Sequence, residues 1–272
     1  WQRRSGGTLA GTPPDEARPK STWSMVNGYD SHAAVWDWDG YDRTPEYDYW
    51  CSYARRYGDK VLIPMCALAE AGAYLARQGF RVTAFDISAE MVYEGRKRFD
   101  SVQNLSLHVA DIRDFRLDER DFDFAFLATQ DLHLLSDIEA VKQAFASLAV
   151  HLRRGGCLAL ELVLPPSESY EYPKRVYHPR VPNYSDKSVW KEGEGRYDAA
   201  TKRHHIIQTV YVRDRQGTSS FPYNIVLQYY ERESILDALS EAGFAVAGEY
   251  GSRAREPLTP QHGEWVIEAV RR

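Results

Sequence analysis

Short apolar runs alternate with helical patterns through the middle of the chain. An apolar run at Val61–Ile63 leads into small residues, and helical spacing then continues until Gly79 ends it. The segment Arg81–Phe85 reads as a second strand, which closes on Asp86. Because a helix connects the two strands, the pattern predicts that they are parallel neighbours in one sheet.

The same alternation continues as far as Pro166. Further strands are predicted at Leu105–Val109, Phe122–Ala128 and Cys157–Pro166, and helices at Asp48–Tyr57, Glu90–Phe99 and Ile138–Leu152. The fourth strand is almost continuously apolar, which favours burial on both faces, as in a parallel sheet. The class predicted is therefore α/β, with a central, mostly parallel sheet and helices on both of its faces.

The region from Tyr170 to Tyr230 breaks this alternation. Polar and apolar residues alternate at Ser188–Gly195, Arg203–Arg213 and Tyr223–Tyr230, with turn residues between them, so we predict an inserted set of antiparallel strands. The aromatic residues before Ser188 are interpreted as a loop. A last helix is expected at Glu233–Ala242, followed by a terminal hairpin of Phe244–Tyr250 and Trp265–Val270.

The first tight turn and the acid after the second strand indicate a binding site. Ligands of open parallel sheets lie outside the carboxyl ends of the strands, beside the first turn. An acid that closes the second strand is well placed to accept hydrogen bonds from both hydroxyls of a ribose. We therefore expect a nucleoside-containing cofactor between Cys66–Ala69 and Asp86.

Two segments carry a resemblance to a known family. The segment that begins at Asp86 reads D-I-S-A-E-M, and the one that begins at His151 reads H-L-R-R-G-G-C-L-A-L-E. Both resemble class I S-adenosylmethionine (SAM) dependent methyltransferases of the small-molecule type, and the resemblance runs from Tyr29 to Pro166. The turn departs from the family's acid and three glycines, because the chain has Ile63, Met65, Ala67 and Ala69 there. Alanine is expected to fit only if the local φ is negative.

The resemblance implies a Rossmann-like class I methyltransferase fold with an aromatic N-terminal lid and an antiparallel strand insertion. The divisions expected are a disordered arm at 1–22, the lid at 23–58, the SAM-binding core at 59–166, the insertion at 167–230, and the last core elements at 231–272. SAM is the implied cofactor. Its implied contacts are Tyr29, Met65, Cys66, Ala67, Asp86, Ile87, Met91, Asp111, Ile112 and Ala128, with Asp111 and Ile112 at the adenine and Tyr29 at the methionine end.

The fourth strand ends in Thr129-Gln130-Asp131-Leu132-His133-Leu134, where a methyl acceptor must lie. This loop resembles that of dTDP-amino-sugar N-methyltransferases, in which His133 matches a histidine, so Asp131 and His133 are the candidates for removing or orienting the acceptor's proton. Tyr29, at the methionine end, is the third catalytic candidate. Candidate acceptor contacts are Tyr41, Tyr47, Tyr170, Tyr172 and His178. The alternatives are that His133 is a helix cap or a packed core residue, that Met91 belongs to the core, and that Asp111 is a loop charge without a function.

Charge and cysteine use narrow the classes of partner. The formal net charge of −5 argues against a nucleic-acid or anionic-membrane partner. Cys51, Cys66 and Cys157 have no disulfide or metal-ligand spacing, which favours a reducing, cytoplasmic compartment. Adjacent residues of a strand face opposite ways, so His204 and His205 cannot share a metal, and we predict none. No apolar run is long enough to span a membrane, and a homodimer is left open.

Three functions are consistent with these patterns. The first is SAM-dependent N- or O-methylation of a small polar molecule, of the kind found in natural-product biosynthesis. The second is a SAM-consuming enzyme that breaks another sulfonium bond, by aminocarboxypropyl transfer or by cyclisation that releases methylthioadenosine. The third is a binding protein without catalysis. A dehydrogenase would need a G-x-G-x-x-G turn and a hydrolase a G-x-S-x-G elbow, and the chain has neither in place.

Overall fold

A computed structural model describes residues 30, 33–128, 130–179, 186–259 and 261–272. Its helices are α2 (Thr44–Tyr57), α3 (Glu70–Arg77), α4 (Ala89–Arg98), α5 (Ile138–His151) and α6 (Arg232–Glu241), with short 3₁₀ turns η1 (Ala33–Val35) and η2 (Leu132–Leu134). Its strands are β1 (Lys60–Pro64), β2 (Arg81–Asp86), β3 (Leu105–Val109), β4 (Phe122–Leu127), β5 (Leu152–Val163), β6 (Tyr170–Tyr177), β7 (Ser188–Asp198), β8 (Arg203–Asp214), β9 (Gly217–Gln228), β10 (Phe244–Tyr250) and β11 (Glu264–Arg271). None of these described helices is long and apolar enough to cross a membrane.

Seven strands form the large sheet, in the order β10-β11-β5-β4-β1-β2-β3. The pairs of β1 with β2 and β4, of β2 with β3, and of β4 with β5 are parallel. Strand β11 is antiparallel to both of its neighbours. The predicted parallel α/β sheet with a terminal hairpin is confirmed.

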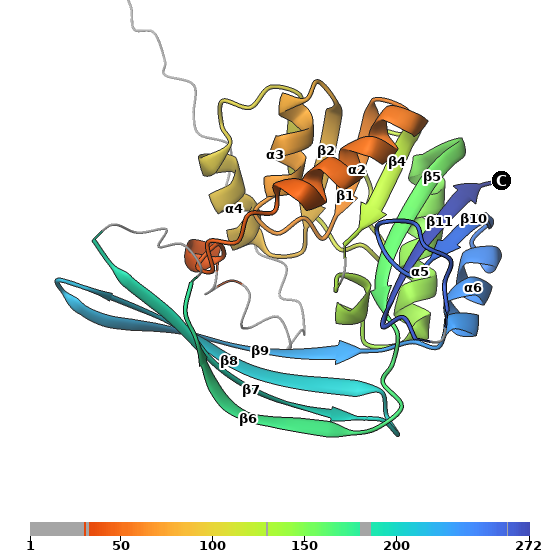
Figure 1. The fold of residues 1–272 in the computed structure, drawn as a ribbon. Helices are drawn as coiled ribbons and strands as arrows, with labels where there is room; N and C mark the ends of the chain where they lie inside the picture. Colours follow the sequence, from red (N-terminus) through yellow and green to blue (C-terminus); the bar gives the residue numbers. More distant parts are fainter. Residues whose placement is uncertain (1–29, 31–32, 129, 180–185, 260) are drawn as a thin grey trace, which may run out of the picture.

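Alternate residues of the central strands enter two separate cores. Leu62 and Ala125 pack with α5 and α6, whereas Val61, Ile63 and Phe124 pack with α2 and α3. Helices therefore cover both faces of the sheet, as the buried fourth strand predicts (Figure 1). The ligand edge is the one at which β1, β2, β4 and β5 end.

The four strands β6–β9 form a second, antiparallel sheet (Figure 1). The interpretation of the aromatic stretch before Ser188 as a loop was wrong for Tyr170–Tyr177, which is edge strand β6. Pro173 argues against a strand in the sequence, because proline cannot donate a hydrogen bond to a neighbouring strand. It is tolerated in β6 because β6 is an edge strand, and the pairing register shifts between Tyr172 and Arg175.

The fifth strand is also longer than predicted. The strand was expected at Cys157–Pro166, but β5 begins at Leu152 and ends at Val163. Figure 1 shows the second sheet facing the edge at which β4 and β5 end, with η1 beside it. Val35 and Trp38 pack there against Val189, Val210 and Tyr223. The second sheet and the described residues 33–38 therefore lie against each other on the side of the ligand edge.

Candidate functional site

The turn after β1 has a left-handed backbone at each position where the family has glycine. Met65 has φ 54°, Ala67 has 48° and Ala69 has 62°. The expectation that alanine requires a negative φ here was therefore wrong. Left-handed φ costs a residue with a Cβ about 1–2 kcal/mol, so the surrounding contacts must hold the turn in this shape.

Backbone hydrogen bonds hold it on two sides. The Cys66 N–H donates to Phe85 O at 3.0 Å, and the Ala69 N–H donates to Cys66 O at 2.7 Å. The Ala67 N–H donates to Asp86 Oδ2 at 2.8 Å. The turn therefore keeps the shape of a glycine-rich turn, while its side chains narrow the space above it.

Asp86 closes β2 at this edge, beside the turn. Its Oδ2 accepts the hydrogen bond from Ala67, and its Oδ1 accepts another from the Ser88 N–H at 2.9 Å. Burial raises the pKa of Asp86, and these two N–H groups oppose that rise. Each carboxylate oxygen can accept a second hydrogen bond, so Asp86 has acceptor capacity left for sugar hydroxyls.

The residues after Asp86 are divided between the edge and the core. The Ile87 side chain is 42% exposed, an apolar surface at the end of β2. Met91 is fully buried and packs with Leu68 and Ala33, so the structure places it in the core, the alternative that the sequence left open. The Ser88 hydroxyl caps α4 at the Met91 N–H and also donates to the Asp30 carboxylate, which brings the chain before α2 to this edge.

The predicted adenine contacts lie at the next strand end. Asp111 accepts a hydrogen bond from Arg113 Nε at 2.9 Å. Burial raises the pKa of Asp111. The hydrogen bonds and the positive charge of Arg113 together lower it by more, so the net shift is downward. The side chain of Ile112 is buried in the core. Asp111 is thus held as a carboxylate beside the edge, and its role toward adenine stays a prediction.

Asp131 lies at the end of β4, and its Oδ2 accepts a hydrogen bond from the Ala128 N–H at 2.8 Å. Burial raises the pKa of Asp131 well above its usual range; the Ala128 N–H opposes the rise, and the carboxylates of Asp86, Glu46 and Glu161 add to it. The pKa of the Cys66 thiol is also raised. Burial is the largest cause, and the negative charges of Asp86 and then of Asp131 add to it. Asp86, Asp131 and the turn therefore share one acidic, half-buried site.

A network of charged residues borders this site, and the sequence did not predict it. Glu161 of β5 is buried at 2% exposure, and Arg253 holds both of its oxygens at 2.8 Å. Arg253 also reaches Glu46, in the first turn of α2, at 3.5 Å. An acid inside the apolar run Leu160-Glu161-Leu162 was the available signal, because a buried carboxylate needs a partner.

His133 is held by the backbone on both sides. Its side chain is 1% exposed, its Nδ1 lies 2.9 Å from Gln228 O, and its Nε2 accepts a hydrogen bond from the Val163 N–H at 3.0 Å. Burial lowers its pKa to about 4, against the opposing effect of Gln228. Both ring nitrogens are engaged, so this geometry fits the packed alternative and not the predicted base.

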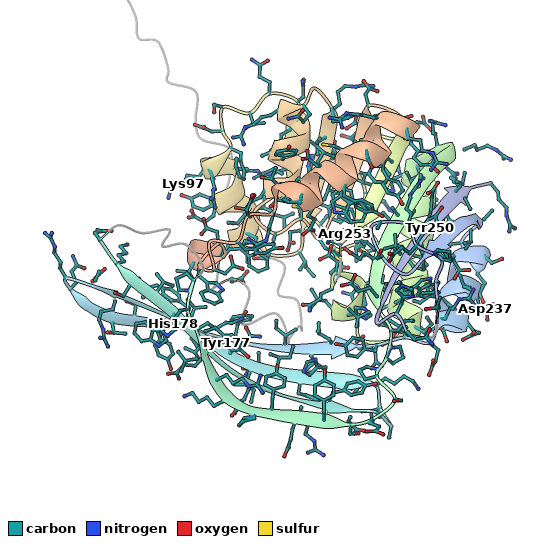
Figure 2. All side chains as sticks on the ribbon, in the orientation of Figure 1. Lys97, Tyr177, His178, Asp237, Tyr250 and Arg253 are labelled. Atoms are coloured by element: carbon teal, nitrogen blue, oxygen red, sulfur yellow. The ribbon has the colours of Figure 1, made fainter. Side chains whose placement is uncertain are left out.

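The predicted acceptor contacts fall into separate groups. Tyr41 and Tyr47 line a cavity of about 330 Å³ between the chain before α2, α3 and α4. Tyr170 and Tyr172 lie on β6, on the second sheet. His178 follows β6 and is exposed (Figure 2). The structure therefore does not gather the five into one pocket, and Tyr29 lies outside the described residues.

A cluster around His204 was not predicted. Tyr170 and Tyr172 meet the His204 ring edge to face, at centroid distances of 5.5 and 5.9 Å, and the Tyr229 oxygen lies 3.4 Å from its Nδ1. His204 is buried whereas His205 is exposed, as expected for neighbours on a strand. Burial is the main cause that lowers the pKa of His204.

The comparisons with known proteins agree with this geometry. Residues 61–156 match a family model described as a methyltransferase domain. The sequence matches no curated protein. The matched segment contains the turn, Asp86, Asp111 and Asp131, so the family match and the site coincide.

Solved structures of low sequence identity share the fold. The sugar N-methyltransferase KedS8 from Streptoalloteichus sp. is 19% identical with a TM-score of 0.71, over 98% of this chain and 100% of its own. The CcbJ methyltransferase from Streptomyces caelestis is 15% identical with a TM-score of 0.71, over 91% and 98%. DesVI from Streptomyces venezuelae is 20% identical with a TM-score of 0.67, over 89% and 98%.

The strained turn leads to a first prediction. Replacing Ala67 and Ala69 together by glycine should raise the free energy of unfolding by about 1 kcal/mol in total, because removing the left-handed strain outweighs the entropy of glycine. Urea unfolding measures the change. The control is Ala73→Gly, inside α3, which should lower the free energy of unfolding by about 1 kcal/mol. Equal effects at both places would show that the turn is not strained.

A second prediction concerns His133. The substitution His133→Ala should lower the free energy of unfolding by about 2–4 kcal/mol, because it leaves the Gln228 carbonyl and the Val163 N–H without their partner. In the wild type the folded-state pKa of His133 is about 4, below the ordinary value of 6.5. Stability from this group is therefore complete above pH 6.5 and is lost as the pH falls toward 4.

The pH dependence separates this role from simple loss of packing. Between about pH 7.5 and about pH 5 the wild type should lose about 2 kcal/mol through His133, a loss that His133→Ala lacks. Urea unfolding at the two pH values measures both proteins. Parallel pH curves for the two proteins would contradict the assignment.

Proposed function

Because residues 61–156 form a SAM-dependent methyltransferase domain, we propose that this enzyme methylates a small polar acceptor, and that an amine is favoured over a hydroxyl. The observation that carries the proposal is Asp131: a half-buried carboxyl group at the end of β4, close to the turn and to Asp86. Neighbours of the same fold bear the names of sugar and glycopeptide N-methyltransferases, which supports a small-molecule acceptor.

The residues at the edge suit SAM by their chemistry. Asp86 retains acceptor capacity for the ribose hydroxyls beside its bonds to Ala67 and Ser88. Ile87 offers an exposed apolar surface for a planar base. When bound, SAM supplies an activated methyl group on a positively charged sulfur, and the surrounding carboxylates favour that charge.

Asp131 is proposed as the residue that orients the acceptor and takes its proton. A nitrogen attacks a methyl group only through its lone pair, so a protonated amine must first lose a proton. The raised pKa of Asp131 makes its carboxylate a better proton acceptor than an exposed aspartate. Glu46 and Glu161 add negative charge nearby, which favours a cationic acceptor over an anionic one at this point.

His133 is proposed as a positioning residue. By joining Gln228 at the end of β9 to Val163 at the end of β5, it ties the second sheet to the edge where the acceptor lies. Alignment of acceptor and methyl group supplies most of the rate in such a transfer. His133 would then act through the placement of Asp131, two residues earlier in the chain.

The cofactor assignment predicts the effect of Asp86→Asn. The substitution keeps the shape but removes the charge, and we expect about a 100-fold loss of SAM affinity, since two charge-assisted hydrogen bonds to the ribose are weakened. Isothermal titration calorimetry with SAM measures it. Asp114→Asn, an exposed acid beyond β3, serves as the control. Unchanged affinity in Asp86→Asn would place the cofactor elsewhere.

The catalytic assignment predicts a different result for Asp131→Asn. An asparagine oxygen can still accept the Ala128 N–H bond, so SAM affinity should stay within about threefold, while turnover falls by about 100-fold or more. The assay follows S-adenosylhomocysteine formation with a panel of small amines and alcohols. Turnover equal to that of the wild type would remove Asp131 from the mechanism.

The same assay also tests whether the enzyme breaks a different bond of the sulfonium. Met65, Ala67 and Ala69 take the left-handed backbone that glycine adopts readily, so the backbone of the turn favours no other bond of the sulfonium. Methyl transfer yields S-adenosylhomocysteine, whereas aminocarboxypropyl transfer and cyclisation both yield methylthioadenosine. Methylthioadenosine as the main product would overturn the proposal.

A further inference from the structure

A second cavity, of about 190 Å³, lies between α2 and the loop that joins β10 to β11. The helix contributes one face of its surface, and the loop contributes two arginines at alternate positions. The lining residues are Tyr49, Ser52, Tyr53, Arg56, Arg253 and Arg255. Three guanidinium groups around one small cavity are unusual in a chain with a net charge of −5.

The inner side of these arginines is held by buried acids. Glu268 is 2% exposed and pairs with Arg56 at 2.9 Å and with Arg255, and it also accepts the Tyr57 hydroxyl. Glu161, equally buried, pairs with Arg253. A guanidinium has five N–H donors, so Arg56 and Arg255, which line the cavity, keep N–H groups beyond those that their contacts to Glu268 use.

The rings and the loop fix the guanidinium planes. Arg255 lies over Tyr53 at 5.0 Å and Tyr250 at 5.1 Å from the ring centroids, and Arg253 lies over Tyr49 at 6.0 Å. Figure 2 labels Arg253 and Tyr250 on the side of the large sheet. Arg255 has a left-handed φ of 61°, and its N–H donates to Ser252 O at 3.0 Å. A strained backbone held in place beside a cavity is characteristic of a ligand site.

From this arrangement we infer that the cavity of Arg56, Arg253 and Arg255 binds a phosphoryl group. Guanidinium groups recognise phosphate oxygens through paired N–H donors. Three of them, from two elements, suit a tetrahedral anion better than a planar carboxylate. The Ser52 hydroxyl donates to Tyr49 O at 2.6 Å, and the Tyr49 and Tyr53 hydroxyls bond to each other at 3.3 Å, so the arginines carry the recognition. Glu46 faces Arg253 from the other side at 3.5 Å, so the attraction comes from aligned donors more than from net charge.

The phosphoryl group has two sources: a free phosphate ion, or a phosphate carried by the acceptor. Arg253 lines the cavity and also contacts Glu161 and Glu46, two acids whose charges act on Asp131. An acceptor with an amine at one end and a phosphate at the other would contact both Asp131 and the cavity. Only this second source rests on the proposed function. Phosphate binding itself is measured without SAM, so either proposal can fail while the other stands.

The test is isothermal titration calorimetry with inorganic phosphate in a phosphate-free buffer of low salt, where screening is weak. The wild type should bind, and Arg255→Gln and Arg56→Gln should each weaken binding about tenfold or more. The matched control is Arg81→Gln, an exposed arginine paired with Asp59, which should bind like the wild type. No binding by the wild type, or equal binding by all four proteins, would overturn the site.

The same set of variants tests whether the substitutions disturb folding and whether the phosphoryl group is free or belongs to the acceptor. Arg255→Gln leaves Glu268 with Arg56 and Tyr57, so its circular dichroism and melting curve should stay close to those of the wild type, and Arg255→Lys should recover part of the affinity. Titration with O-phosphoethanolamine follows. Binding at least tenfold tighter than inorganic phosphate, lost in Asp131→Asn, assigns the site to the acceptor, whereas equal binding assigns it to a free anion. Unchanged binding of both probes in Arg255→Gln would again overturn the site.

Discussion

The hydrogen bond from the Ala67 N–H to Asp86 is the contact on which the site depends. It joins the end of β2 to a turn whose residues would relax out of the left-handed region if nothing held them. The same carboxylate accepts the Ser88 N–H, and Ser88 in turn caps α4. One acid thus fixes the turn, the start of a helix and the position at which a ribose is expected, and its burial is part of the same arrangement.

The buried acids of the large sheet form ion pairs with arginines that are distant in the sequence. Glu161 and Glu268 belong to neighbouring strands of the large sheet, and both receive arginines from the loop between β10 and β11. Glu161 pairs with Arg253 and Glu268 with both Arg255 and Arg56 of α2, so these ion pairs couple the terminal hairpin to β5 and to α2. Asp131 accepts the Ala128 N–H bond, but its burial and the nearby charges of Asp86, Glu46 and Glu161 raise its pKa.

The sequence predicted the sheet well because periodicity and turn residues report burial directly. It failed at β6, where Pro173 masks an edge strand, and at the turn, where the sign of φ for Ala67 and Ala69 depends on tertiary hydrogen bonds. His133 illustrates the limit for sites. Its position after β4 was read correctly, yet whether an imidazole faces a cleft or two backbone groups depends on β5 and β9, which are distant in sequence.

The two sides of the site place different demands on an acceptor. In the proposed site, the carboxyl groups near the turn would favour positive charge and take up a proton, while the arginines of the second cavity would hold a phosphoryl group through their N–H donors. An acceptor that satisfied both would be a zwitterion held at its two ends, and its orientation would be set by charge before any shape was read. The His133 contact to β9 would then keep the second sheet at a fixed distance from both ends. Selectivity in this enzyme would therefore reside mainly in the spacing of opposite charges, and the aromatic residues of the second sheet would refine it.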